Sequence, residues 1–314
     1  MKGVQFDGID FGGLKGVETL ATLPLGINAR KTFTEIIHQF QSQGYEEGKQ
    51  LFGLPHDWRM GIHIDDTFWD RTKDLIERSV FLNNNSKAVI IGHSYGAQMI
   101  LYFLNEKVTK EWRDKFIGKI LFVSPALSGA YNVPILHYGM FPKLRLIKNR
   151  KISNFLRSLP VMYDLLPNEI FFSNQTLLSF NDKTVKANEV IEHFEKHPEF
   201  TEEQKNIMRT SIGISKKLPK DYEIETFIIY NSEIGTEFGF NETNGKSLVT
   251  SGDNSVTSKG AEWVCKNWSK IKCMDVKKNN RNFNHMGILN NPYTVDLIVK
   301  WIIGNNGTDT KSEL

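Results

Sequence analysis

The chain has 314 residues, of which 40% are hydrophobic and 24% are charged, so it is long and apolar enough to bury a large core. Its net charge of +3 is small, and Lys and Arg are nearly balanced by Asp and Glu, which argues against a nucleic-acid partner. No apolar run reaches the roughly 18 to 20 residues of a membrane-spanning helix, because polar residues interrupt the best stretch, 88–104. We therefore expect a soluble globular protein.

The first predicted element is an amphipathic helix over residues 32–44. Its apolar face carries Phe33, Ile36, Ile37 and Phe40. Thr32 and Glu35 have the spacing of a capping box, and Gly44 is placed to end the helix. A short strand is expected next, around residues 50–52.

A second helix is predicted over residues 67–81, and three apolar, mostly β-branched runs beyond it predict strands at 88–91, 120–123 and 226–230. The inner face of this helix is expected to carry Phe68, Leu75, Ile76 and Ser79. The first strand is short and apolar enough to be buried on both faces. Strands that alternate with helices predict an α/β fold with a mostly parallel sheet.

The domain organisation follows from a change of pattern in the middle of the chain. Residues 129–221 are helical and irregular and rich in Leu, Phe, Pro and Lys, which favours a cap inserted into the sheet domain. The core is then predicted to comprise residues 1–128 and 222–314. A last helix is expected to begin with Asn291 as its N-cap and Pro292 in its first position.

The most informative motif is Gly92-x-Ser94-x-Gly96, which lies between a predicted strand and a predicted helix. In that context the motif predicts a nucleophile elbow with Ser94 as the nucleophile. Both glycines are expected because a Cβ beside the strained turn would clash with its neighbours. The backbone amide of Tyr95 is placed to stabilise an oxyanion. The alternative is a glycine-rich turn without chemistry.

A nucleophilic serine needs a base and an acid, which follow it along the chain in the order acid then histidine. His285 fits the base because it alone among eight histidines lies in a loop after the last strand and before the last helix. His93, inside the elbow, is expected to point away from the attacking atom. Asp253, in a turn-rich segment, is favoured as the acid, and Asp275 is the alternative, interpreted as structural.

Several segments resemble one known family in order over nearly the whole chain. They are Gly3-Val-Gln, Gly44-Tyr45, Leu51-Phe-Gly-Leu-Pro-His-Asp57-Trp58-Arg59, Gly92-His-Ser94-Tyr-Gly96, Gly252-Asp253-Asn-Ser-Val256 and His285-Met-Gly-Ile-Leu289. Together they resemble the lecithin:cholesterol acyltransferase family of α/β-hydrolases, which includes lysosomal phospholipase A2 and phospholipid:diacylglycerol acyltransferases. The segment with Trp58 is the most specific, because generic lipases lack it.

This resemblance implies an α/β-hydrolase fold with helices on both faces of the sheet and an inserted cap. It implies a catalytic triad of Ser94, Asp253 and His285 that takes an acyl group from a glycerophospholipid and gives it to water or to a lipid alcohol. Trp58 is expected to contact the substrate. No metal or organic cofactor is needed, and peripheral contact with a membrane surface is expected.

Two departures from the family open alternatives. The family's N-terminal strand and the Pro-Gly loop that supplies a second oxyanion donor precede the matched region, so that strand is expected to be missing. Gly12-Gly13 or another amide would then supply the donor. Residues 124–129 lack the family's Pro-aromatic-Gly-Gly pattern, which puts the acyl-pocket contacts there in doubt. A non-catalytic lipid-binding protein and a generic soluble esterase are the competing hypotheses.

The compartment is suggested only by short signals. Glycosylation sequons begin at Asn84, Asn174, Asn241, Asn267 and Asn306. The chain ends in Lys311-Ser-Glu-Leu314, one residue away from an ER-retention signal, although its start does not read as a signal peptide. The lumen of the secretory pathway or a lysosome-like compartment is suspected. Cys265 and Cys273 are expected either to pair across a short loop or to remain buried thiols.

Overall fold

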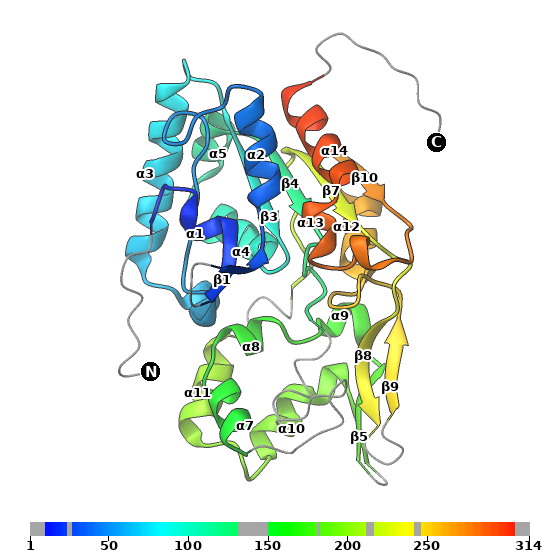
Figure 1. The fold of residues 1–314 in the computed structure, drawn as a ribbon. Helices are drawn as coiled ribbons and strands as arrows, with labels where there is room; N and C mark the ends of the chain where they lie inside the picture. The colour runs from blue at the N-terminus through cyan, green and yellow to red at the C-terminus, as the bar shows by residue number, and fades with distance from the viewer. Residues whose placement is uncertain are drawn as a thin grey trace.

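A parallel sheet of four strands lies at the centre of the computed structural model (Figure 1). The structure describes residues 10–23, 27–130, 150–180, 183–211, 217–241 and 246–304. In spatial order the strands are β10 (Ile271–Asp275), β7 (Glu225–Tyr230), β4 (Ile117–Val123) and β3 (Ala88–His93). The predicted strands at 88–91, 120–123 and 226–230 are therefore confirmed, and so is the α/β-hydrolase class.

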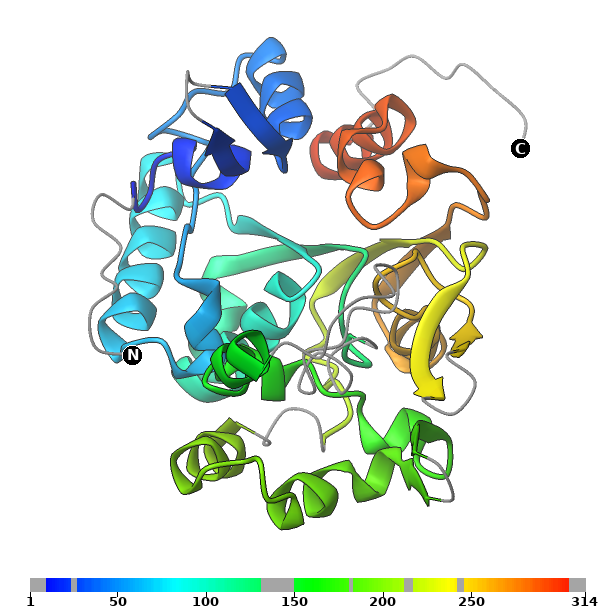
Figure 2. The ribbon, with the colours of Figure 1, turned by 60° about the horizontal axis from the view of Figure 1, so that its bottom comes forward.

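Side chains that alternate along the central strands build one core on each face of the sheet. On β4, Ile120 and Phe122 join the first core, whereas Leu121 and Val123 join the second. The first core is covered by α3 (Asp66–Leu82), α4 (Gly96–Tyr102), α5 (Lys110–Phe116) and α12 (Lys259–Asn267). The second is covered by α2 (Thr34–Ser42), α13 (Gly287–Asn290) and α14 (Pro292–Ile303) (Figure 2). Helices thus cover both faces, as predicted.

The strand that leads to the motif serine lies at one edge of the described sheet. β3 pairs with β4 on one side, and within the described ranges no strand pairs with its other side. Residues 88–91 are half-buried, so the prediction that they are buried on both faces is wrong. The prediction of a missing N-terminal strand stays a prediction.

The first predicted helix forms with a different start. Phe33 is the N-cap of α2 and makes no side-chain capping bond, so the predicted capping box is wrong. The Thr32 hydroxyl donates to the Val17 carbonyl instead, and Glu35 pairs with Lys31 at 2.8 Å. Tertiary partners have replaced the local cap.

Two other predictions before β3 need correction. No strand forms at 50–52, where Leu51 makes only an isolated bridge to Glu47. The segment ahead of α2, for which no element was predicted, folds as α1 (Lys15–Glu18) and an antiparallel hairpin of β1 (Thr19–Leu23) and β2 (Ile27–Lys31).

The buried face of α3 also differs from the predicted one. Its buried residues are Trp69, Thr72, Ile76 and Val80, so only Ile76 of the predicted inner face is fully buried.

A second layer, drawn in green and yellow at the bottom of Figure 1, contains five α-helices among the described residues. They are α7 (Arg150–Arg157), α8 (Val161–Asp164), α9 (Glu169–Phe172), α10 (Val190–Lys196) and α11 (Glu202–Ser211). A small sheet joins them in the order β6 (Lys183–Lys186), β5 (Thr176–Phe180), β8 (Thr236–Asn241) and β9 (Lys246–Thr250). This sheet takes strands from both sides of the predicted boundary at 221/222, and the domain bounds stay a prediction.

The C-terminal part of the core is fastened at two points. Asn291 caps α14 by accepting from the Tyr293 N–H at 3.0 Å, with Pro292 in the first turn, as predicted. Cys265 and Cys273 form a disulfide that ties α12 to β10. Across the described ranges, no helix combines the length and the apolar character that crossing a membrane requires.

Candidate active site

The motif serine lies at the sharp turn that leaves β3. Ser94 has a φ of 55°, in the left-handed region that non-glycine residues rarely adopt. Three backbone hydrogen bonds hold it there: its N–H donates to the Val123 carbonyl at 3.1 Å, and its carbonyl accepts from Ala126 at 3.0 Å and from Ala97 at 3.2 Å. Such a conformation persists only when surrounding contacts determine it. The turn is therefore the strained elbow that the sequence predicted.

The two motif glycines have different reasons to be there. A Cβ on Gly92 would lie 3.0 Å from the Gly96 carbonyl carbon and 3.1 Å from the Ala97 nitrogen, so a side chain does not fit. A Cβ on Gly96 would meet no atom within 4 Å among the described residues. The steric prediction is confirmed for Gly92 and wrong for Gly96.

The structure brings the three predicted catalytic residues together. His285 Nε2 lies 2.8 Å from Ser94 Oγ, and His285 Nδ1 lies 2.7 Å from Asp253 Oδ2. His285 lies between η6, a short 3₁₀ helix (Arg281–Phe283), and α13, while Asp253 follows β9. This is the geometry of a nucleophile, a base and an orienting acid.

Asp253 is held by more than the imidazole. Its Oδ1 accepts from the N–H groups of Ser255 at 3.0 Å and Val256 at 2.8 Å, and its carbonyl accepts from the His285 N–H at 2.9 Å. Burial opposes ionisation, but the proximity of His285 and these hydrogen bonds outweigh it and hold the pKa of Asp253 below its usual value. Asp253 is therefore suited to remain a carboxylate beside the base.

Asp275, the alternative acid, bonds to a structural partner, in agreement with its interpretation as a structural residue. Asp275 accepts from the Ser232 hydroxyl at 2.6 Å and from the Ser232 N–H at 3.1 Å. These bonds fasten the loop after β7 to the end of β10. Asp275 is thus engaged elsewhere, while Asp253 bonds to His285.

His93 lies against the base, and its predicted orientation away from the attacking atom stays a prediction. Its Nε2 donates to the His285 carbonyl oxygen at 2.8 Å, and the two rings lie 4.6 Å apart between centroids. Burial, together with the nearby His285, lowers the pKa of His93 to about 3. The alternation of side chains along β3 did not predict this contact, because the backbone turns sharply at Ser94, directly after His93. The ring is neutral and supports the backbone of the base.

Tyr95 combines a free backbone donor with an occupied side chain. Within the described residues its N–H has no acceptor, which suits the oxyanion role predicted for it. Its ring is buried, and its hydroxyl donates to Asp164 Oδ2 at 2.6 Å. Nothing in the sequence pattern pointed to this partner from the cap. The amides predicted to supply a second donor are engaged, since Gly12 donates to Gly53 at 2.9 Å and Gly13 to Asp10 at 3.0 Å.

Trp58 lies in a short 3₁₀ helix, η2 (Trp58–His63), and half of its surface is exposed. Its neighbours in the sequence pair with each other, because Arg59 donates to Asp57 at 2.8 and 2.7 Å. Asp57 also caps η2 by accepting from the Arg59 N–H at 3.1 Å. The segment therefore has a structural role, and the contact of Trp58 with substrate stays a prediction.

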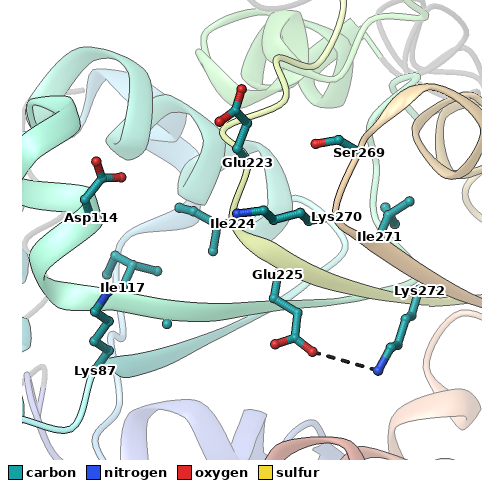
Figure 3. A pocket seen from close by; sticks show the side chains of 11 residues that line it. Lys87, Asp114, Ile117, Glu223, Ile224, Glu225, Ser269, Lys270, Ile271 and Lys272 are labelled. Carbon is teal, nitrogen blue, oxygen red and sulfur yellow. Dashed lines mark ion pairs between the residues drawn. The ribbon is translucent and has the colours of Figure 1, made fainter.

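An open hollow of about 670 Å³ (Figure 3) lies beside the amino ends of the central strands, at the other end of the sheet from the triad. Charged side chains of both signs surround it, and Lys272 lies 3.9 Å from Glu225. In a parallel sheet the catalytic groups gather at the carboxyl ends of the strands, whereas this hollow lies at their amino ends. The described part of the chain holds no group of three or more His, Cys, Asp or Glu side chains that could hold a metal ion.

Comparison with known proteins gives the chain a family context. The lysosomal phospholipase A and acyltransferase of Bos taurus is 28% identical over 160 residues, which are 51% of this chain and 38% of that protein. The lecithin-cholesterol acyltransferase-like 1 of Oryza sativa subsp. japonica is 24% identical over 191 residues, or 58% of this chain and 44% of that protein. The chain thus spans less than half the length of these relatives.

Among solved structures, the chain in the Tle4-Tli4 complex is similar with a TM-score of 0.49 and 10% identity, covering 92% of this chain and 77% of that one. A model of the family described as lecithin:cholesterol acyltransferase matches residues 7–230, which include the elbow, Trp58 and all of the predicted cap. Since the match extends over most of the chain, the resemblance drawn from the motifs is confirmed. The chain belongs to the lecithin:cholesterol acyltransferase family.

Proposed function

We propose that this chain transfers an acyl group from a glycerophospholipid, through an acyl-enzyme on Ser94, to water or to a lipid alcohol. The observation that carries the proposal is the continuous hydrogen-bonded path from Ser94 through His285 to Asp253. Family membership supports the lipid class, since the relatives above are named as a phospholipase and as acyltransferases.

The proposed reaction has two halves. Ser94 Oγ attacks the ester carbonyl carbon while His285 Nε2 takes its proton, and the collapse of the tetrahedral intermediate expels the lysolipid oxygen, which receives that proton. Water or a lipid alcohol then attacks the acyl-enzyme, His285 takes the proton of the attacking hydroxyl, and Ser94 Oγ leaves and recovers it. Asp253 stays ionised and stabilises the imidazolium in both halves. These steps use no metal or organic cofactor.

The Tyr95 N–H is the proposed oxyanion donor. It is unoccupied within the described residues and directly follows the attacking serine, the position that supplies one donor in nucleophile elbows. Removing one such donor typically costs about 100- to 1,000-fold in rate. A retained triad with one donor is therefore compatible with catalysis, which disfavours the non-catalytic lipid-binding alternative.

We also propose that the protein meets its substrate at a membrane surface in an oxidising, lysosome-like or secretory compartment. The disulfide supports such a compartment, since disulfides persist mainly outside the reducing cytosol. Relatives named as lysosomal support it as well. Of the sequon asparagines, Asn84, Asn174 and Asn267 are exposed, whereas Asn306 and the Lys311–Leu314 end lie outside the described residues.

The test is incubation of the purified protein with phosphatidylcholine vesicles, with and without a sterol or diacylglycerol, followed by lipid analysis. Ser94→Ala is the inactive control, and Ser42→Ala, on the exposed last residue of α2, is the matched substitution that should change nothing. A fluorophosphonate probe is applied in parallel to report an activated serine.

Release of fatty acid that depends on Ser94 would establish a phospholipase, and a new ester of the added alcohol would establish a transferase. Cleavage of short-chain esters without any vesicle product would favour the generic esterase. A folded protein that neither labels at Ser94 nor forms product would overturn the catalytic proposal.

A further inference from the structure

A buried carboxyl group from the cap is bonded to the residue that follows the nucleophile. Asp164, the last residue of α8, has no exposed surface, and its Oδ2 accepts from the Tyr95 hydroxyl at 2.6 Å. The same oxygen accepts from the Ile62 N–H of η2 at 3.3 Å. Three segments far apart in the chain therefore meet at one oxygen atom. We call Tyr95, Asp164 and Ile62 the cap latch.

The backbone around the cap latch is shaped to admit the carboxyl group. Gly61 has a φ of 58°, and a Cβ there would lie 2.1 Å from Asp164 Oδ2 and 2.8 Å from the Tyr95 hydroxyl. Glycine is therefore required on conformational and on steric grounds. The backbone at Gly61 is thus preorganised to admit the carboxyl group of Asp164.

Burying Asp164 costs free energy that an apolar residue at the same position would not cost. Asp164 Oδ1 is buried and has no hydrogen-bond partner within the described residues. A buried unpaired carboxyl oxygen destabilises a fold by a desolvation cost that an apolar residue of similar size would avoid. A group of this kind is a candidate for a role beyond stability.

We propose that the cap latch is a positioning device, in which the cap, through Asp164, holds Tyr95 so that its backbone N–H faces the developing oxyanion. This inference rests on the proposed function, because it takes the Tyr95 N–H as the oxyanion donor. Asp164 and the Tyr95 hydroxyl act through the position of Tyr95 and touch no reacting atom.

Geometry links the hydroxyl to the amide. A tyrosine side chain has only two rotatable bonds before its rigid ring, so fixing the hydroxyl and burying the ring restricts the orientation of the Cα and of the attached N–H. The preceding residue, Ser94, is in a strained conformation, and release of Tyr95 would let both relax. Since oxyanion stabilisation depends on donor placement within a few tenths of an ångström, loss of the cap latch lowers kcat rather than substrate binding.

The test measures kcat and KM for an activated short-chain ester with Tyr95→Phe, Asp164→Ala, Asp164→Asn and the double variant Tyr95→Phe/Asp164→Asn. Tyr95→Phe keeps the ring and the backbone N–H and removes the hydroxyl that bonds to Asp164. Tyr163→Phe is the matched control, because it removes a buried hydroxyl from the adjacent position on α8 without touching the elbow.

We expect kcat to fall about 10- to 100-fold in Tyr95→Phe and Asp164→Ala, within the range for a misplaced donor, with KM nearly unchanged. Asp164→Asn, which retains an acceptor, should recover most of the loss, and the double variant should be no slower than Tyr95→Phe. Tyr163→Phe should lower the melting temperature and leave kcat unchanged.

Equal kcat in the wild type and Tyr95→Phe, or a parallel loss in Tyr163→Phe, would overturn the cap latch while Ser94-dependent turnover left the proposed function intact. If the wild type itself shows no Ser94-dependent reaction, the proposed function fails first. Hydrogen exchange at residues 58–64 and 161–166 then tests the contact separately: faster exchange in Tyr95→Phe than in Tyr163→Phe at the η2 segment supports it, and identical exchange removes it.

Discussion

Two buried carboxyl groups flank the elbow, one from the core and one from the cap, and their surroundings differ. Asp253 is 3% exposed and accepts hydrogen bonds at both oxygens, from two amides and from His285. Asp164 is equally buried, but only its Oδ2 has partners within the described residues. The pKa of Asp253 is held below its usual value, whereas burial raises the pKa of Asp164 to about 7.

Hydrogen-bond partners, more than burial, therefore decide the charge of a carboxyl group beside this site. Amide donors and an adjacent imidazole compensate the desolvation of Asp253, so it is ionised throughout the physiological range. A phenol and one amide compensate the desolvation of Asp164 less well, so it exchanges its proton near neutrality. The core side of the site is thus fixed in charge, and the cap side responds to pH.

The largest loss of activity is expected from Asp253→Asn, which removes the charge beside His285. The amide cannot hold His285 in the required tautomer, so we expect kcat to fall about 10³- to 10⁴-fold with little change in KM. Steady-state turnover of an activated ester measures the loss. Asp275→Asn is the matched control, because it weakens only bonds to Ser232 and Lys277, away from the triad, and should keep wild-type kcat. A similar loss in both variants would contradict the assignment.

A second prediction concerns stability against pH, where Asp164 and His93 act in opposite directions. The pKa of Asp164 is raised from 3.8 to about 7, so its contribution stabilises the fold at low pH and is lost as the pH rises towards 7. The pKa of His93 is lowered from 6.5 to about 3, so its contribution is lost as the pH falls from 6.5 towards 3. At full extent the shift of Asp164 corresponds to about 4 kcal/mol and that of His93 to about 5 kcal/mol.

Substitutions separate the two contributions to the pH dependence of stability. Asp164→Asn removes the contribution of Asp164, so as the pH falls from 7 to 4 its melting temperature should drop more steeply than that of the wild type. His93→Gln removes the contribution of His93, so its melting temperature should stay constant or rise as the pH falls over the same interval. The titratable groups that face them are Tyr95 for Asp164, and His285 and Asp253 for His93. Thermal denaturation followed by circular dichroism measures both, and parallel curves for all three proteins would contradict the pKa directions.

The elbow glycines offer a smaller, paired test. Gly92→Ala forces a Cβ against backbone atoms, and we expect a loss of about 1 to 3 kcal/mol in the free energy of unfolding. Gly96→Ala enters open space at the start of α4, where alanine favours the helix, so its stability should be unchanged or slightly raised. Urea denaturation measures both, and equal losses would show that the elbow constrains Gly96 as well.

The smallest effect is expected from the neighbour of the base. His93→Ala removes the N–H that supports the His285 carbonyl, and we expect kcat to fall about tenfold, which corresponds to the loss of one hydrogen bond of ordinary strength. Glutamine can present an N–H to the same carbonyl and should recover part of the loss. A kcat unaffected by alanine would leave His93 as packing alone.

The sequence was sufficient for features that depend on short motifs or on chain order. The elbow, the strands beside it and the meeting of Ser94, Asp253 and His285 follow from the motif and from the order of catalytic residues in the fold. Asn291 and Pro292 predicted the start of α14 because a helix N-terminus is set by adjacent residues.

Features that depend on tertiary partners were missed. The predicted capping box does not form because the Thr32 hydroxyl bonds to the Val17 carbonyl instead. The predicted strand at 50–52 does not form because Leu51 makes only an isolated bridge and has no neighbouring strand. Asp164 could not be linked to Tyr95, because 69 residues of strands, turns and cap segments separate them. No periodicity within a helix or strand encodes a contact across two layers.

The small sheet constrains how this architecture can be rebuilt. Because β8 and β9 follow residue 221 and pair beside β5, the small sheet takes its strands from two separate stretches of the chain, and the second ends at Thr250, three residues before Asp253. An exchange of the single insert 129–221 between relatives would break the pairing of β5 with β8 and leave one edge of each strand unpaired, which favours aggregation. A chimaera needs to carry residues 236–250 as well, and its junction would then lie immediately before the catalytic acid.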